Sequence, residues 1–563
     1  MKNLLMKQAL ALIFYTCLYL CTAPYTLAHT YYLSSKGDDA NPGTSRASAW
    51  RSIAKANSHR YSAGDTLLLE AGHTFAGGLY FHPDNFQGKG APLVISSFGD
   101  GRATIDADTS YAFYAHNVAG IEIRQLNFRG SGPDSNSNSG ILFYNNLPGD
   151  IKLKHIVIDQ VEVTGFRKSG ITIGSWSGNS GFEEVRITRA VVHHIGSEGI
   201  NTWGEFDQNK KGYAHRNVYI GHCHVYQVYG LPLTDKHSGS GIVLSDVDGG
   251  TIEHSVVNSS GMGNTNCGGP VGIWAWDANK VTIQYNEAYN MSAGSGCDGG
   301  GFDLDGGVTN SVMQYNYSHD NDGAGFLIAQ FEWARPMHNN IIRYNISEND
   351  GRKNDYKGIT LWVADQYHKG GNRDLLVYNN TVFADKAVAP TGGGVFFKSG
   401  QHHNVHFFNN IFYTRSGAPL LLAADTAALD VHFHNNAWYS EDGSYTFVWG
   451  DARYTSLQDF RTATGQETDQ NQPTGITADP KLTAPGTVGT LGYPLNLQSL
   501  QDRYGLQKKS PLIGQGIAVA LPAPFIPAEQ DILGHPIHDA AAPDMGAIAY
   551  TRPKWLEWLR ELF

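Results

Sequence analysis

The sequence predicts an all-β protein: a right-handed parallel β-helix solenoid with a short C-terminal capping helix. The first observation is composition. The 563 residues include 65 glycines, 12% are aromatic and only 17% are charged, and glycine at this frequency without a collagen period indicates β-structure with many turns. The second observation is a repeat of about thirty residues, a period at which each unit holds two or three short strands and stacks on its neighbours as a solenoid.

One series of the repeat is an asparagine that follows an aromatic ring. It recurs with steps of 30, 29, 34, 30 and 26 residues at Asn286, Asn316, Asn345, Asn379, Asn409 and Asn435. We expect this asparagine at one corner of every coil, where its amide bonds to the copies above and below and its backbone takes the left-handed bend. Blades of a β-propeller, at about 40–50 residues, are longer than this period.

A second series predicts one strand per coil, each opening on glycine. The copies cover residues 241–245, 272–276, 301–305, 325–329, 358–362 and 394–398, with earlier copies from Gly140, Gly170 and Gly199. Alternate residues of a strand face opposite sides. One set is therefore predicted to stack inside the coil: Ile242, Ile273, Phe302, Phe326, Ile359 and Val395. The outward rows run Val243, Trp274, Asp303, Leu327, Thr360, Phe396 and Ser245, Trp276, Asp305, Ala329, Trp362, Lys398.

The outward rows carry large rings where a purely structural solenoid would carry small polar residues. Exposed indoles are costly unless something covers them, so either long loops fold over this face or it is an open groove in which sugar rings stack. Coils repeat at about 4.8 Å, close to the length of one sugar unit. The predicted carbohydrate-binding residues are Trp203, Trp274, Trp276, Trp362, Phe396 and Lys398.

Carboxylates gather on the same face. Asp303 and Asp305 lie on one strand, and Asp277 follows Trp276 one coil earlier. Like charges this close raise one another's pKa, which leaves one acid protonated while another is ionised, as glycoside hydrolysis requires. The three aspartates are the predicted catalytic residues. Asp305, beside Trp276, is assigned as general acid and Asp303 as the ionised partner, which Asp277 supports.

Three further aspartates form a candidate metal site. Asp298 and Asp322 occupy matching places on adjacent coils, and Asp320 lies nearby. Together with backbone carbonyls of the glycine-rich turns they could hold Ca²⁺, which takes six to eight oxygen ligands. The alternative is that they cap turns. Hydrolysis requires no cofactor, so Ca²⁺ is an optional component of the prediction.

Two other functions stay open besides a secreted polysaccharide-degrading glycoside hydrolase. A Ca²⁺-dependent lyase acting on a uronate polymer needs a basic side chain, but the acidic cluster contains no Lys or Arg, and Lys398 is expected roughly 14 Å from Asp305. A non-catalytic carbohydrate-binding solenoid would have the aromatic rows without converging acids. The hydrolase therefore ranks first, with a polysaccharide or oligosaccharide as its partner.

The N-terminus is predicted to be an export signal. Lys2 and Lys7 precede an apolar run from about residue 9 to residue 20, and the small-residue site at 26–28 fits cleavage. Residues 1–28 would then be a signal peptide and the protein secreted or periplasmic. Nothing else in the chain is long and apolar enough to span a membrane.

The remaining chain divides by regularity. We expect the first coils over 29–130, the regular helix with the active face over 131–440, and closing turns over 441–563, with a short helix at 454–465 and a helical cap at 554–563. Cys223, Cys267 and Cys297, an odd and sparse set, do not suggest a disulfide framework. The net charge of −11, which becomes −13 without Lys2 and Lys7, argues against nucleic acid as a partner. We expect a monomer.

Segments at both ends carry a family resemblance. They are residues 31–44 (YYLSSKGDDANPGT), 64–69, 92–95, 103–106, 479–481 and 543–547. In these the chain resembles the pectate-lyase-like superfamily of secreted right-handed β-helix enzymes, which holds lyases, hydrolases and epimerases. The resemblance implies the fold. It also implies aspartates projecting from neighbouring coils, to which Asp277, Asp303 and Asp305 are similar in kind. Polygalacturonase-like members carry Asn-x-Asp and then Asp-Asp, whereas this chain has Trp-Asp and then Asp-Leu-Asp.

Overall fold

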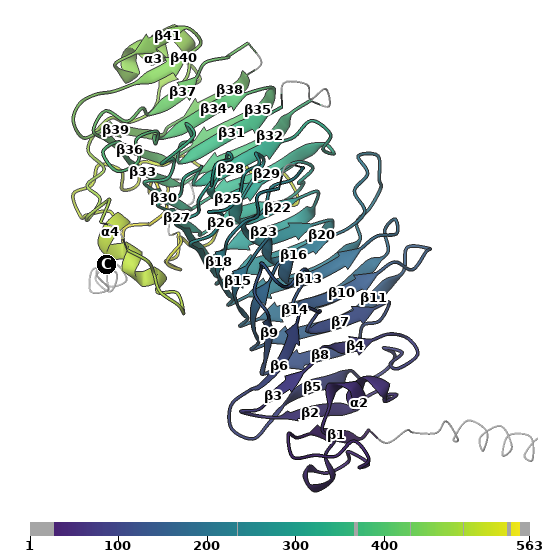
Figure 1. Cartoon of the computed structure of the whole chain (residues 1–563). Helices are drawn as coiled ribbons and strands as arrows, with labels where there is room; N and C mark the ends of the chain where they lie inside the picture. Colours follow the sequence, from purple (N-terminus) through teal and green to yellow (C-terminus); the bar gives the residue numbers. More distant parts are fainter. Residues whose placement is uncertain are drawn as a thin grey trace, which may run out of the picture.

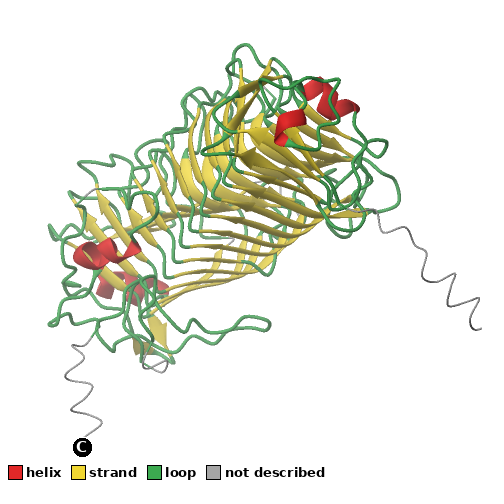
Figure 2. Cartoon of the chain, turned by 90° about the horizontal axis from the view of Figure 1, so that it is seen from below, coloured by secondary structure: helices red, strands yellow, loops and turns green. Residues whose placement is uncertain are grey.

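Three long sheets, parallel except for the last strand pair of one of them, wind around one axis (Figure 1). The computed structural model describes residues 28–551, except 234, 365–369, 428, 488 and 538–541. Each sheet takes every third strand of the chain, so that consecutive strands lie on different sides of the coil and strands about thirty residues apart pair in parallel. This arrangement confirms the predicted β-helix. Seen from below, the strands stack along the axis and the helices lie toward its ends (Figure 2).

The A sheet consists of β1 (Thr30–Leu33), β2 (Thr66–Glu70), β5 (Leu93–Phe98), β8 (Ile121–Arg124), β11 (Lys152–Asp159), β14 (Gly181–Thr188), β17 (His215–Gly221), β20 (Val247–Glu253), β23 (Asn279–Gln284), β26 (Val312–Gln314), β29 (Met337–Arg343), β32 (Asn372–Tyr378), β35 (His402–Phe408) and β38 (Leu429–His434). The B sheet consists of β3 (Thr74–Ala76), β6 (Ala103–Asp108), β9 (Leu126–Gly130), β12 (Glu162–Phe166), β15 (Val191–Ile195), β18 (His224–Val228), β21 (Val256–Asn258), β24 (Glu287–Tyr289), β27 (Tyr317–His319), β30 (Ile346–Glu348), β33 (Thr381–Asp385), β36 (Ile411–Arg415) and β39 (Ala437–Ser440). The C sheet consists of β4 (Leu79–Phe81), β7 (Phe113–His116), β10 (Ile141–Asn145), β13 (Ser169–Ser175), β16 (Glu198–Trp203), β19 (Ser240–Ser245), β22 (Val271–Trp276), β25 (Gly300–Leu304), β28 (Phe326–Gln330), β31 (Ile359–Val363), β34 (Val395–Ser399), β37 (Leu421–Ala423), β40 (Phe447–Trp449) and β41 (Ala452–Tyr454).

Helices are short and lie outside the coils. They are α2 (Ile53–Ser58), α3 (Leu457–Thr464) and α4 (Gln501–Tyr504), with 3₁₀ turns at Arg46–Ser48 and Leu497–Leu500. The predicted helix at 454–465 is α3, which begins at the cap Ser456 and ends at Gly465 in the left-handed conformation. The predicted signal peptide, apart from Ala28, and the predicted cap at 554–563 lie outside the described residues. In the described part, no helix is long and apolar enough to cross a membrane.

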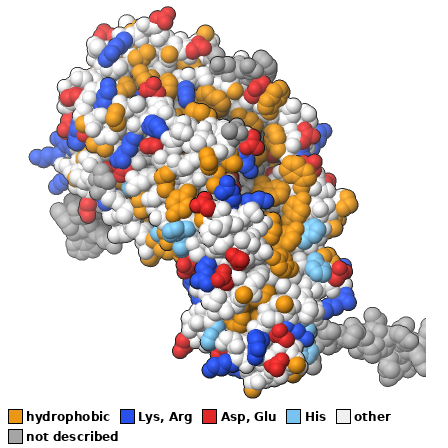
Figure 3. All heavy atoms as spheres, viewed as in Figure 1, with side chains coloured by type: hydrophobic (Ala, Val, Ile, Leu, Met, Phe, Trp, Pro, Cys, Tyr) orange, Lys and Arg blue, Asp and Glu red, His pale blue; other side chains and the backbone are white. Residues whose placement is uncertain are grey.

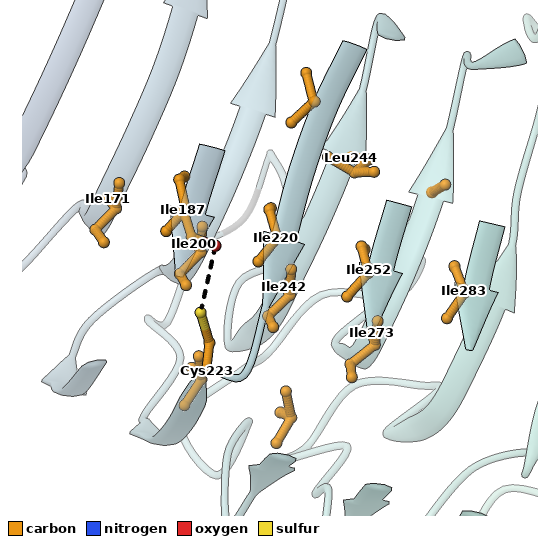
Figure 4. Packing of buried hydrophobic residues seen from close by; sticks show 14 of the residues in the cluster. Ile171, Ile187, Ile200, Ile220, Cys223, Ile242, Leu244, Ile252, Ile273 and Ile283 are labelled. Atoms are coloured by element: carbon orange, nitrogen blue, oxygen red, sulfur yellow. Dashed lines mark hydrogen bonds between the residues drawn. The ribbon is translucent and has the colours of Figure 1, made fainter. Parts of the chain in front are cut away.

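Aliphatic side chains stack along the inside of the coils. The predicted inner row pairs in register from Ile242 through Ile273, Phe302, Phe326 and Ile359 to Val395, and each of these side chains is at most 1% exposed. Figure 4 shows the same stacking for the isoleucines of neighbouring sheets. Burying one such side chain fully is worth about 1.5–3 kcal/mol, so this core stabilises the solenoid along its length.

The predicted outer rows are confirmed with one correction. Trp274 pairs with Asp303, Asp303 with Leu327, and so on to Phe396, as expected. A register shift between Leu361 and Trp362 pairs Trp362 with Ser399 instead of Lys398. An irregularity of this kind moves every later side chain along the row, so Lys398 does not continue the row of Trp362.

A ladder of asparagines stacks at the corner between the A and B sheets. Its members are Asn286, Asn316, Asn345, Asn380, Asn410 and Asn436. Each member after Asn286 accepts from the backbone N–H and the side-chain amide of the copy before it, and Glu467 ends the ladder. The predicted Asn379, Asn409 and Asn435 are not these members. They take the left-handed conformation one residue earlier, as Tyr285, Tyr315 and Tyr344 do in the coils before. The bend and the stacking belong to two successive residues.

The chain after the last coil runs back along the outside of the A and B sheets. The backbone N–H of Leu491 donates to Glu287, and the hydroxyl of Tyr493 donates to the carbonyl of His222. Further on, Arg343 donates to the carbonyl of Ile526. The closing segment therefore covers two sheets and leaves the C sheet to other loops.

Candidate active site

A cavity of about 500 Å³ lies on the outer face of the C sheet, over β22, β25, β28 and β31. On the side of the molecule that Figure 3 shows, hydrophobic side chains gather in a band along the solenoid, with basic and acidic side chains beside it. The cavity is lined by Phe206, His237, Cys267, Gly268, Trp274, Trp276, Cys297, Asp298, Asp303, Asp305, Leu327, Ala329, Phe331, Tyr356, Trp362 and Lys398. It combines aromatic walls with a few converging polar groups, as carbohydrate and other small-molecule sites do.

Loops cover the outer rows here, so the expectation of an open groove is wrong for these coils. Trp274 is 4% exposed and Asp303 is 2% exposed. Phe206 and Phe331, from loops before β17 and after β28, lie with their rings 5.6 Å and 6.1 Å from the ring of Trp276. The sheet supplies the floor and the loops supply the walls, which makes the site a pocket.

Asp303 and Asp305 project into the cavity from β25 and its end, as the alternation predicted. Burial raises the pKa of Asp305 to about 7, and Asp298 nearby acts in the same direction, while the backbone N–H of Gly306 donates to its carboxylate at 2.6 Å and opposes the rise. The pKa of Asp303 is raised well above its usual range by burial and by Asp305 and Asp298. This direction favours the neutral form of Asp303, whereas the sequence predicts it as the ionised partner.

Asp298, predicted as a metal ligand, lines the same cavity. Burial raises its pKa, but two neighbours favour its ionised form: the hydroxyl of Tyr356 donates to its carboxylate, and the ammonium group of Lys398 lies nearby. Lys398 in turn is 3.3 Å from the hydroxyl of Tyr356 and 4.4 Å from the centre of its ring. The expectation that no basic side chain reaches the acidic cluster is wrong, because Lys398 lies in the cavity with the acids.

Three residues that line this cavity each carry a buried polar atom with no hydrogen-bond partner among the described residues. The atoms are Oδ1 of Asp303, Nε1 of Trp274 and Nδ1 of His237. Burial lowers the pKa of His237 to about 4, so its ring is neutral at physiological pH. Because buried polar groups are nearly always paired, such a cluster indicates a place where a polar ligand completes the bonding.

Asp277, predicted as a catalytic residue, lies outside the cavity lining and forms an ion pair with Arg335. It is 1% exposed and is not among the cavity-lining residues, and the guanidinium of Arg335 donates to its carboxylate. Arg335 also donates to the carbonyl of Gly212 at 3.0 Å and lies over the ring of Tyr213. The ion pair ties the covering loops to the sheet, so Asp277 has a positioning role.

The other candidate metal ligands do not converge with Asp298. Asp320 is paired with Arg352 and His319, and Asp322 accepts from the backbone N–H of Ala293 at 2.9 Å. Within residues 28–551, with their gaps, no group of three or more His, Cys, Asp and Glu side chains is placed to hold a metal ion. Each aspartate satisfies a local turn or ion pair instead.

The predicted sugar-binding residues divide between two cavities. Trp362 and Lys398 line the cavity of about 500 Å³ with the acids, and Trp203 lines a second cavity of about 870 Å³. Trp274 and Trp276 line both, so the two cavities adjoin. Phe396 lies outside both, beneath the ammonium group of Lys357 at 5.2 Å from its ring, and the expectation that it contacts sugar is not supported.

The sequence reasoning missed several members of the cavity wall. Cys267 and Cys297 form a disulfide there, with a sequence separation of 30. That spacing equals one coil and was an available signal in the sequence. Among the described residues, Cys223 is the one free cysteine, and it is buried. Tyr356 and His237 come from connecting loops, where the repeat gives no register, so no signal in the sequence places them.

Comparison with known proteins agrees with the fold. The sequence profile of the family described as right handed beta helix region matches residues 215–372. Lacto-N-biosidase from Bifidobacterium longum subsp. longum is 28% identical over 492 residues, which cover 68% of this chain and 28% of that protein. The chain thus spans less than a third of the length of this curated relative.

Solved β-helix structures are similar at lower identity. A GH136 lacto-N-biosidase from Eubacterium ramulus is 19% identical, with 67% of this chain and 68% of that chain covered and a TM-score of 0.49. Pectate lyase Pel9A is 15% identical, with 93% and 96% covered and a TM-score of 0.38.

Proposed function

We propose that this protein is a glycoside hydrolase whose catalytic centre is the cavity on the outer face of the C sheet. The observation that carries the proposal is the convergence of Asp298, Asp303 and Asp305 on one aromatic-walled cavity, with the pKa of each carboxyl raised. Acids held at different protonation states are what glycosidic bond cleavage requires. The sequence relationship to a lacto-N-biosidase supports the same chemistry.

Asp298 and Asp305 form the catalytic pair. Burial, Asp305 and Asp298 raise the pKa of Asp303 well above its usual range and favour its neutral form, whereas an efficient general acid has a pKa near the working pH. Asp305, with its pKa of about 7, meets this condition. Asp298 has Tyr356 and Lys398 to favour its anion. The two carboxyls can thus share a proton, and they titrate as a coupled system.

The proposed reaction follows from the roles of these carboxyls. The protonated member donates to the glycosidic oxygen as the bond from that oxygen to the anomeric carbon breaks, and the leaving sugar departs as an alcohol. The ionised member either attacks the anomeric carbon or takes a proton from the water that attacks it. Water supplies the hydroxyl of the new reducing end and restores the proton. Asp303, as a neutral acid, donates a hydrogen bond to the substrate.

The substrate class is an oligosaccharide with a lacto-N-biose unit. The name of the curated relative suggests this disaccharide. A covered cavity of about 500 Å³ suits the end of a sugar chain, whereas a polymer bound along its length needs an open groove. The polysaccharides expected from the sequence remain in the test as the competing class.

The test is hydrolysis by the purified protein of an aryl lacto-N-bioside, of oligosaccharides ending in lacto-N-biose, and of plant, algal and bacterial polysaccharides. We expect reducing ends to appear with the lacto-N-biose substrates. Asp298→Asn and Asp305→Asn should each lose at least about 100-fold in kcat, a loss typical of general acid–base residues, while Asp303→Asn loses less. On a substrate whose leaving group needs no proton, the variant that lacks the general acid should recover much of its kcat.

Two results would overturn the proposal. If no member of the panel is cleaved while sugars still bind, the protein is a carbohydrate-binding solenoid. If a uronate polymer yields the ultraviolet absorbance of an unsaturated product, Lys398 serves a lyase. Full activity of Asp305→Asn would remove the catalytic pair even if hydrolysis is observed.

We also propose that the protein works outside the cytoplasm as a monomer. The predicted signal peptide and the disulfide between Cys267 and Cys297 support export, because disulfides persist in oxidising compartments. Detection of the protein, shortened by its first 28 residues, in the periplasm or medium tests the location, and gel filtration tests the monomer.

A further inference from the structure

Rings and small residues alternate along one outer row of the C sheet. In register, the row that contains Asp305 reads His116, Tyr144, Gly174, Trp203, Ser245, Trp276 and Asp305. From Tyr144 onward a large ring stands on every second coil, and a glycine or serine stands on the coil between. We call Tyr144, Trp203 and Trp276 the ring platform.

The small residue at Gly174 is required by the platform. A Cβ atom added there would lie 2.4 Å from Cζ2 of Trp203 and 2.5 Å from its Cε2. The indole therefore lies against the glycine backbone of the preceding coil. This packing keeps the ring down along the sheet, with its centroid 5.8 Å from the centroid of the Tyr144 ring.

The platform leads into the catalytic cavity. Tyr144, Trp203 and Trp276 all line the cavity of about 870 Å³, and Trp276 lines the catalytic cavity as well. Glu198 also lines the larger cavity. Burial raises the pKa of its carboxyl and so favours the neutral form, and the hydroxyl of Ser197 donates to it at 2.8 Å. The floor is thus aromatic, with a polar carboxyl at its side, and it is continuous with the site of the proposed reaction.

We propose that the ring platform binds the part of the substrate that extends from the scissile bond toward the N-terminal coils, one ring beneath every second sugar unit. Two coils span about 9.6 Å, close to the length of two sugar units. Trp203 stands three coils, about 14 Å, from Asp305, and so lies beneath the third unit from the cleavage site. The ligand is a neutral oligosaccharide of at least five units with flat sugar faces. The inference rests on the proposed hydrolase and deepens it.

The experiment compares kcat/KM on two substrates. One is a pentasaccharide with lacto-N-biose at its non-reducing end, whose three remaining units reach Trp203; the other is the aryl lacto-N-bioside, which does not. Trp203→Ala should lower kcat/KM on the pentasaccharide by about tenfold, equivalent to 1.4 kcal/mol, and leave the aryl substrate unchanged. Gly174→Ala should reproduce the defect, since it displaces the same ring without removing it. Trp333→Ala, an indole 60% exposed and outside both cavities, is the matched control.

Equal effects of Trp203→Ala on both substrates, or none on either, would overturn the platform. Its failure is separable from failure of the proposed function. If the wild type cleaves neither substrate, titration of the pentasaccharide followed by tryptophan fluorescence tests the platform without catalysis. Weaker binding by Trp203→Ala than by the wild type would support the proposed platform. Unchanged binding, or no binding by the wild type, would contradict it.

Discussion

Two rows of buried polar side chains run through the same coils, and they are satisfied in opposite ways. In the corner ladder, each of Asn286, Asn316 and Asn345 donates to the next copy and to a backbone carbonyl. On the outer face of the C sheet, Trp274 and Asp303 are just as deeply buried, but Nε1 of one and Oδ1 of the other have no partner in the described part of the chain.

The difference separates stability from function. A paired buried amide contributes to stability, while an unpaired buried group costs about 1–3 kcal/mol. Several unpaired groups around one cavity therefore indicate a ligand site, because the polar groups of a ligand complete the hydrogen bonding. Three predictions follow from this contrast, beginning with the largest expected effect.

Removing one member of the corner ladder should destabilise the protein without affecting its chemistry. Asn316→Ala leaves the backbone N–H and the amide of Asn286 without their acceptor, and the carbonyl of Ile283 without its donor. We expect the free energy of unfolding to fall by about 2–4 kcal/mol, the cost of leaving buried polar groups unpaired. Urea denaturation measures it. A stable variant with reduced kcat would contradict the division between the two rows.

The acidic cluster should make stability depend on pH. The folded pKa of Asp305 is about 7, against an ordinary value of 3.8, so the folded chain binds more protons than the unfolded chain between these values. The stability this provides is complete below about pH 4 and is lost as the pH rises through about 7. The melting temperature of the wild type should therefore fall across this window, and the fall should be smaller in Asp305→Asn. An identical dependence in both proteins would show that this carboxyl ionises freely in the folded state.

The smallest effect should come from an unpaired donor. Trp274→Phe keeps one aromatic ring and removes the pyrrole part of the indole, with the N–H that has no partner in the described structure. No hydrogen bond within the described structure is lost, so the melting temperature should fall only by the packing that the smaller ring gives up. KM for the lacto-N-biose substrate should rise about fivefold, the effect of one hydrogen bond worth about 1 kcal/mol. A lower melting temperature with unchanged KM would place this indole with the stabilising residues.

Regular features of the fold were predictable because they repeat. The period of about thirty residues, the inner row from Ile242 to Val395, and the outward direction of Asp303 and Asp305 are all confirmed. Small departures from the repeat produced small errors. The bulge after Leu361 displaced Lys398 by one place, and the stacked asparagine follows the left-handed residue instead of being that residue.

By itself, the sequence determined the solenoid, its inner and outer faces, and the coils on which acids and tryptophans gather, because alternation and period are local properties of the chain. The tertiary structure decided which of those residues form the site. Tyr356 reaches Asp298, and Arg335 reaches Asp277, each across 58 residues, or two coils. Those contacts come from connecting loops that have no period, and their packing depends on surfaces that exist only after the coils have stacked. The same loops convert an exposed sheet into a covered cavity, and that burial raises the pKa values on which the proposed chemistry depends.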